Sequence, residues 1–195
     1  MTGERAHHAF LAALQALSRG LTAQAAPYML IGGVAVILRG VPRHTEDIDA
    51  AVWAEHLDTE RLLDVLAAHE IVGRIPDLVG FAAEYQVFLL RHAPSGTPVE
   101  IKLASLAFER DAIARAETFA ARDIPVPVAT AEDLILYKVV SWRERDRADI
   151  ERLLRLHHAR IDVVRVRETV RVFSEALGEP ERITDMERMI IRALP

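Results

Sequence analysis

Apolar and polar residues follow two different periods along the chain. Apolar positions three or four residues apart predict amphipathic helices, and alternation at every second residue predicts strands. The predicted helices span 6–19, 34–39, 59–69, 108–122, a segment that begins at 131, 148–158, 163–177 and 182–194, and the predicted strands span 28–31, 45–52, 85–91, 98–103 and 124–128. The segment 72–80, which contains Pro76, predicts no regular element.

The order of these elements predicts an α+β fold. Strands and helices are mixed up to about residue 128, and only helical patterns follow from Thr130 onward. We therefore expect a mixed β-sheet flanked by helices at 1–128, and a C-terminal helical region at 129–195 packed on it. Gly20 predicts the end of the first helix, and the prolines of 124–128 predict an edge strand.

Local signals mark the starts of three helices. Asp58 is expected to cap the helix at 59–69, and Asp146 the helix at 148–158. Thr130 and Asp133 form the pattern of a capping box.

The composition is that of a globular protein, with 51% hydrophobic and 27% charged residues. The absence of cysteine excludes disulfides and thiolate metal sites, so we expect a cytoplasmic protein. The net charge of −5 lies in residues 1–130, because cations and anions are equal in number in 131–195. This charge balance does not indicate an extended basic surface that binds nucleic acid, although it is compatible with a local basic groove.

One uncharged stretch, residues 20–38, has nearly the length of a membrane span. Thr22, Gln24, Pro27 and a glycine pair interrupt it. We predict a loop, a buried strand and a helix there, and no membrane-spanning segment. The polar N-terminus lacks the pattern of a signal peptide.

The strongest chemical signal is the pair Asp47 and Asp49. Side chains two apart on a strand point the same way, so the two carboxylates are expected on one face. Carboxylates held close together repel each other unless a cation lies between them, and a divalent metal ion is the usual solution.

The glycine pair Gly32-Gly33 precedes a predicted helix and suits a phosphate. Glycine lets the backbone approach a phosphate closely, and the first N–H groups of a helix favour an anion. A phosphate-binding site beside metal-binding carboxylates is suited to the transfer of a nucleotide from a triphosphate. The alternative is an acidic pair at a hairpin edge beside an ordinary Gly-Gly turn.

Gly32-Gly33, a spacer and Asp47-x-Asp49 resemble the signature of the DNA polymerase β-like nucleotidyltransferase superfamily. The surrounding residues, with Arg43-His-Thr45 before the acidic pair, look most like the AbiEii-type nucleotidyltransferase toxin branch. Many superfamily members have Gly-Ser where this chain has Gly-Gly. The resemblance implies a nucleotidyltransferase fold, two Mg²⁺ ions, and nucleotide binding by the glycines, Arg43 and Thr45.

Glu100 is the candidate third carboxylate. It alternates with Val99 and Ile101 on the predicted strand 98–103, and strand pairing would bring it beside Asp47 and Asp49. The superfamily more often has Asp at such a position. The alternative is a solvent-facing Glu on an edge strand.

A second motif, from Asp133 to Ile150, resembles the helical motif of the same branch. The resemblance implies that Lys138 contacts a triphosphate oxygen and that Asp146 or Asp149 orients this lysine or the acceptor. Arg143 joins the nucleotide-binding residues on the same basis. The alternative is a solvated helix face with salt bridges.

These observations predict an Mg²⁺-dependent nucleotidyltransferase that uses an NTP and releases pyrophosphate. Asp47, Asp49 and Glu100 would hold the metal ions, with Lys138 as a further catalytic residue. The resemblance implies a tRNA 3′ end or a protein hydroxyl as acceptor, and a toxin restrained by an antitoxin protein. Two alternatives remain: a transferase for a small molecule such as an aminoglycoside, and a nucleotide-binding or interaction module without turnover.

Overall fold

The computed structural model describes residues 2–193 and shows two compact units. The first unit comprises Met1–Val34 and His44–Ala129, and the second comprises Ala35–Arg43 and Thr130–Pro195. The ends of the two predicted domains, Met1 and residues 194–195, lie outside the described residues.

The units differ from the expected division in one segment. Residues 35–43 belong to the helical second unit, although they precede the acidic pair in sequence. Two contacts explain this assignment. His157 Nε2 donates to the Arg39 carbonyl oxygen at 3.0 Å, and Arg43 Nη1 donates to Asp149 Oδ2 at 2.7 Å.

The first unit contains a mixed sheet, as predicted, but the sheet has seven strands where five were expected, in the order β3-β4-β5-β2-β1-β7-β6. Its strands are β1 (Tyr28–Ile31), β2 (Ile48–Trp53), β3 (Ile71–Gly73), β4 (Val87–His92), β5 (Pro98–Ala104), β6 (Glu117–Ala121) and β7 (Ile124–Val128). β2 pairs with β5, and β1 with β7, in parallel, whereas the other neighbours are antiparallel.

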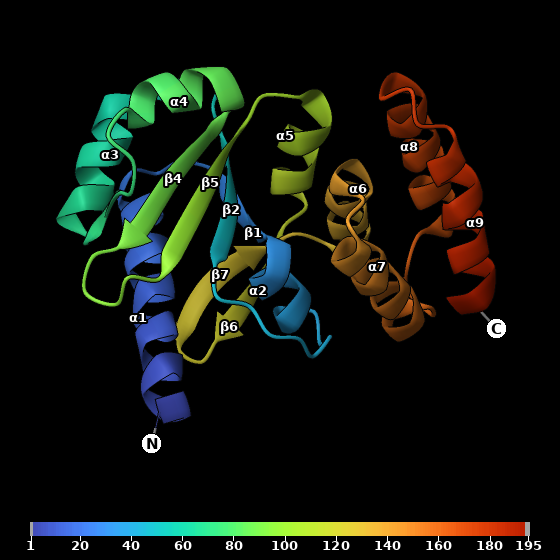
Figure 1. Ribbon diagram of the computed structural model, residues 1–195, viewed down its shortest axis with the longest axis horizontal. Helices are drawn as coiled ribbons and strands as arrows, with labels where there is room; N and C mark the ends of the chain where they lie inside the picture. Colours follow the sequence, from blue (N-terminus) through green and yellow to red (C-terminus); the bar gives the residue numbers. More distant parts are fainter. Residues whose placement is uncertain (1, 194–195) are drawn as a thin grey trace. The chain divides into compact units, whose positions relative to one another are not determined.

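The helices of this part of the chain are α1 (Thr2–Ala23), α2 (Gly32–Leu38), α3 (Thr59–Ala68), α4 (Leu78–Tyr85) and α5 (Ala107–Ala114). α1 crosses the sheet, because it contacts both β7 and β3, which lie near opposite ends of the strand order (Figure 1). Asp58 caps α3, as predicted, by accepting from the Arg61 N–H at 3.0 Å.

Gly20 does not end α1, contrary to the prediction. A Cβ added at Gly20 would lie 2.9 Å from Leu66 Cδ2 on α3. The glycine therefore allows two helices to approach closely, and α1 continues to Ala23.

Two segments were predicted with the wrong structure. The segment 72–80, expected to be irregular, contains most of β3 and the start of α4, with Asp77 as the N-cap. The helix expected at 108–122 ends at Ala114, and its second half is β6. β6 pairs along its whole length with β7, so a tertiary partner outweighs the local helical pattern.

β7 is not an edge strand, although its prolines predicted one. It lies between β1 and β6. Its register with β1 involves only Val128, which faces Leu30, whereas Pro125 and Pro127 pair only with β6. The prolines thus occupy the part of β7 that has a partner on one side, where a missing N–H is tolerated.

The second unit is built from α6 (Ala131–Ser141), α7 (Glu144–His157), α8 (Val163–Ala176) and α9 (Glu181–Ala193). Each of these helices packs against two others, in the closed order α6-α7-α9-α8. Met186, Met189 and Ile190 are buried, so the apolar stripe of α9 belongs to the core.

The starts of two helices test the predicted caps in this unit. Thr130 caps α6, as predicted, by accepting from the Asp133 N–H at 3.2 Å. Asp146, predicted as a cap, lies instead in the first turn of α7 and accepts from the Arg143 N–H at 3.2 Å. Within residues 2–193, no helix has the length and apolar character needed to cross a membrane.

Candidate functional site

The glycine pair and the acidic pair meet at the junction of β1 and β2. Ile31 pairs with Asp49 in the antiparallel register, so Gly32 follows β1 directly beside this carboxylate. Gly32 has a φ of +63°, and a Cβ added there would lie 1.8 Å from Asp49 Oδ2. Gly32 is thus required both by its backbone conformation and by the space that the Asp49 carboxylate occupies.

Asp47 lies just before β2 and is held locally. Thr45 Oγ1 donates a hydrogen bond of 2.7 Å to Asp47 Oδ1. Among residues 2–193, no group of three or more acidic or histidine side chains is gathered closely enough to hold a metal ion. The expected three-carboxylate cluster of Asp47, Asp49 and Glu100 is therefore not assembled in this structure.

Asp49 and Glu100 do share a site. They are paired in the parallel register of β2 and β5, and both line a cavity of about 250 Å³. Val99 and Ile101 are fully buried, whereas Glu100 and Lys102 line the cavity, as strand alternation predicted. The cavity wall also includes Ile31, Tyr85, Gln86 and Val87.

Two cations beside this cavity are paired with carboxylates. Arg74 Nη2 donates to Glu100 Oε1 at 2.5 Å, with side-chain exposures of 31% and 38%. Lys102 Nζ lies 3.1 Å from Oε1 of the fully buried Glu109.

The residues present suit a hard divalent cation shared with a substrate. Mg²⁺ prefers oxygen ligands and is usually bound by one or two carboxylates plus substrate phosphates. Asp49 and Glu100 supply two such carboxylates on neighbouring strands. Glu100 would have to exchange its contact with Arg74 for the metal ion.

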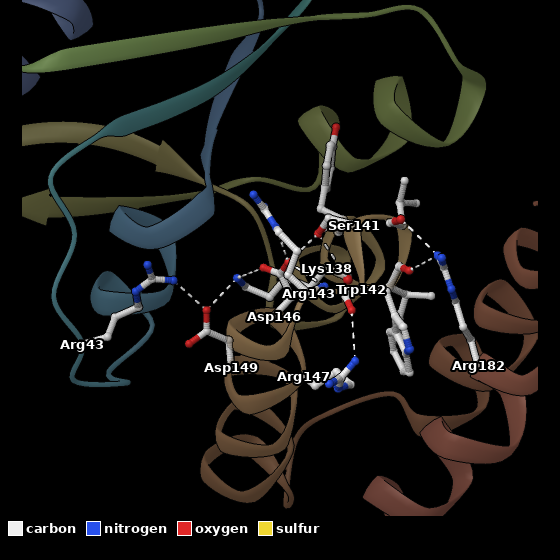
Figure 2. A network of polar contacts seen from close by, with 12 residues as sticks. Arg43, Lys138, Ser141, Trp142, Arg143, Asp146, Arg147, Asp149 and Arg182 are labelled. Atoms are coloured by element: carbon white, nitrogen blue, oxygen red, sulfur yellow. Dashed lines mark hydrogen bonds and ion pairs between the residues drawn. The ribbon is translucent and has the colours of Figure 1, made fainter. Parts of the chain in front are cut away.

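The second predicted motif forms a buried ionic network within the second unit (Figure 2). Lys138, only 5% exposed, donates from Nζ to Asp149 Oδ2 at 2.7 Å and to Asp146 Oδ1 at 3.3 Å. Arg43 donates to the same Asp149 oxygen. Lys138, Asp146, Asp149 and Arg43 are thus brought together, and both aspartates hold the lysine.

Asp146 also receives two further hydrogen bonds from side chains, besides the one from the Arg143 N–H. Ser141 Oγ and Arg143 Nε each donate to Asp146 Oδ2 at 2.8 Å. Burial by itself would raise the pKa of the Asp146 carboxyl, but these hydrogen bonds and the charges of Lys138 and Arg143 outweigh it and lower the pKa. Asp146 is therefore stabilised as a carboxylate.

Arg74 and Tyr85 are two residues beside the cavity that sequence analysis missed. A signal for Tyr85 was present, because Leu78, Phe81 and Tyr85 follow a helical period after the capping residue Asp77. Arg74 carried no comparable signal, since its partner Glu100 lies 26 residues further along the chain.

Solved structures share this fold. JHP933 from Helicobacter pylori is 15% identical, with a TM-score of 0.55, over 97% of this chain and 92% of that one. ANT(2″)-Ia, solved in complex with adenylyl-2″-tobramycin, is 18% identical, with a TM-score of 0.53, over 84% of this chain and 95% of that one. At these identities the likeness establishes the nucleotidyltransferase fold alone.

No curated protein matches this chain in sequence. The sequence profile of one family, described as nucleotidyltransferase of unknown function (DUF6036), matches residues 8–188. This match covers most of the chain, including both predicted motifs. The chain therefore belongs to this nucleotidyltransferase family.

Proposed function

We propose that this protein is a metal-dependent nucleotidyltransferase that moves a nucleotide from an NTP to an acceptor hydroxyl. The observation that carries the proposal is the arrangement of Gly32, Asp49 and Glu100. A glycine without room for a side chain packs against one carboxylate, and a second carboxylate lies at the paired position of the next strand.

In this reaction Asp49 and Glu100 would hold Mg²⁺ together with phosphate oxygens, and Asp47 would join them once the substrate is bound. The metal supplies Lewis acidity that stabilises charge on the phosphates. The acceptor oxygen forms a bond to the α-phosphorus, and the bond from the α-phosphorus to the oxygen that leads to the β-phosphate breaks. Pyrophosphate leaves, and Glu100 accepts the hydroxyl proton.

On the basis of the motif resemblance, Lys138 would bind the outer phosphates of the NTP. Asp146 and Asp149 would then fix its ammonium group, since both accept hydrogen bonds from it. Arg43, Thr45 and Arg143 remain predicted nucleotide contacts. The role of each is tested by its effect on triphosphate binding.

Two observations bear on the chemical identity of the acceptor. The resemblance to the AbiEii-type branch favours a tRNA 3′ end or a protein hydroxyl, in a toxin with an antitoxin partner. The two carboxylates that line the cavity, Asp49 and Glu100, favour instead a cationic small molecule, and ANT(2″)-Ia was solved with an adenylylated aminoglycoside. A non-catalytic nucleotide-binding module is the third possibility.

The test is incubation of purified protein with Mg²⁺, each labelled NTP and separate pools of total tRNA, protein extract and tobramycin. Pyrophosphate should appear in proportion to the label incorporated. Asp49→Asn should abolish transfer, whereas Asp123→Asn, the same change at an exposed carboxylate of the first unit, should retain it.

Two results would contradict the proposal. Full transfer by a folded Asp49→Asn protein would remove this site from the reaction. If nucleotide and metal bind together but no pyrophosphate forms with any acceptor pool, the binding module would replace the enzyme.

A further inference from the structure

The side chain of Tyr85 is exposed and also lines the cavity of the candidate site. It is the last residue of α4 and remains 58% exposed, yet it lines the same cavity as Asp49 and Glu100. An aromatic ring that is left accessible at the wall of a cavity with two carboxylates offers a large apolar surface to a ligand that binds there.

The ring of Tyr85 packs against a second aromatic ring. Its centroid lies 4.5 Å from that of Phe81, one helical turn earlier, with an interplanar angle of 30°. The next residue, Gln86, ends α4 in the left-handed conformation, with a φ of 56°. Its carbonyl oxygen accepts from the Leu103 N–H at 2.8 Å, which ties this end of the helix to β5. A ring that already packs on another loses less side-chain entropy when a ligand binds than a ring without such a contact.

The strand order places Tyr85 on the opposite side of the carboxylates from Gly32. Gly32 follows β1, Asp49 is on β2, Glu100 is on β5, and Tyr85 lies near the start of β4, and these strands are neighbours in that order. Nucleotidyl transfer is an in-line displacement, in which the attacking and leaving oxygens lie on opposite sides of phosphorus. If the triphosphate lies toward Gly32, the acceptor approaches from the side of Glu100 and Tyr85.

We propose that Tyr85, supported by Phe81, forms the acceptor subsite, and that it packs against the ring of a sugar whose hydroxyl is the acceptor. This inference rests on the proposed nucleotidyl transfer and assigns the acceptor side of the same cavity. A flat aromatic face suits the C–H face of a saturated ring, and Glu100 next to it suits the ring hydroxyl. Such a hydroxyl occurs both in a free amino sugar and in the terminal ribose of RNA.

The experiment compares variants on labelled transfer with tobramycin and with total tRNA, with protein extract as the third pool. Tyr85→Ala should raise KM for the sugar acceptor about tenfold, the loss of one aromatic contact, while KM for the NTP stays within about twofold. Tyr85→Phe should restore most of the acceptor affinity because it keeps the ring. Tyr85→Leu keeps apolar bulk without an aromatic face and should fall between them.

Val79→Ala is the matched control. Val79 lies on the same helix, is 52% exposed and does not line the cavity, so its removal should leave both KM values unchanged. The acceptor that incorporates label, either tobramycin or tRNA, identifies the source of the sugar.

Three outcomes would overturn the inference. The first is an unchanged acceptor KM in folded Tyr85→Ala, and the second is an equal rise in KM for the NTP. The third is label found only in the protein pool. In these cases transfer that still depends on Asp49 would leave the proposed function standing, whereas the absence of pyrophosphate from every pool would remove both.

Discussion

Replacing Gly32 by alanine tests the contact on which the candidate site depends. The added Cβ would lie 1.8 Å from Asp49 Oδ2, 2.6 Å from its Cγ and 2.7 Å from its Cβ. Asp49 would have to move, and its strand register leaves the backbone little freedom to follow. Alanine at a φ of +63° also adds backbone strain.

The chain offers a control that separates the two effects. Gly96 has a φ of +73°, and a Cβ there would meet no atom within 4 Å. Gly96→Ala should therefore cost only the backbone strain, about 1 kcal/mol of unfolding free energy. Gly32→Ala should cost that amount plus about 1–3 kcal/mol for overpacking against Asp49.

Urea unfolding followed by Trp53 fluorescence measures the difference, because Trp53 lies at the end of β2. A Trp142→Phe background removes the other tryptophan. Nucleotide transfer should fall about a hundredfold in Gly32→Ala, since a displacement of about 1 Å at a reacting group has an effect of this size. Gly96→Ala should transfer at the wild-type rate.

A double variant identifies the cause. Asp49→Gly removes all three side-chain atoms that the new Cβ would approach. Gly32→Ala should then cost no more than Gly96→Ala when it is measured in the Asp49→Gly background. Equal costs for Gly32→Ala and Gly96→Ala in the wild-type background would refute the reasoning.

Three further predictions concern the charged residues. Lys138→Ala should weaken triphosphate binding more than monophosphate binding, measured by calorimetry, and should destabilise the second unit by about 1.5–3 kcal/mol because two buried carboxylates lose the charged donor that they share, while Arg43 and Arg143 stay in place; the same change at Arg188, which belongs to an exposed ion pair, should cost less than about 1 kcal/mol, and equal costs would contradict the network. The lowered pKa of Asp146 contributes stability above the ordinary carboxyl pKa of about 4, and this is lost as pH falls through the folded-state value, so Asp146→Asn should flatten the acid limb of a plot of unfolding free energy against pH; an unchanged slope would contradict this. Arg74→Ala should lower the Mg²⁺ concentration needed for half-maximal NTP binding, because Arg74 competes for Glu100; a higher concentration would instead make Arg74 a substrate contact.

Sequence patterns determined the parts of this protein that depend on neighbours in the chain. The alternation placed Asp49 on the face opposite to the buried Ile48 and Ala50, and Glu100 on the face opposite to the buried Val99 and Ile101. The caps at Asp58 and Thr130 follow from hydrogen bonds that close within three residues. The mixed sheet followed by helices was predicted for the same reason, because periodicity reports which face of an element is buried.

Tertiary structure decided everything that depends on which element lies opposite. Pairing with β7 made a strand of a predicted helix, and contact with Leu66 gave Gly20 its role inside α1. The ion pair of Glu100 with Arg74, and the ion pairs of Lys138 with two aspartates, do not follow from the hydrophobic periodicity of any single element. Periodicity specifies that a face is buried but not its partner, so the surroundings of Asp49 emerge only when β1, β2 and β5 lie side by side.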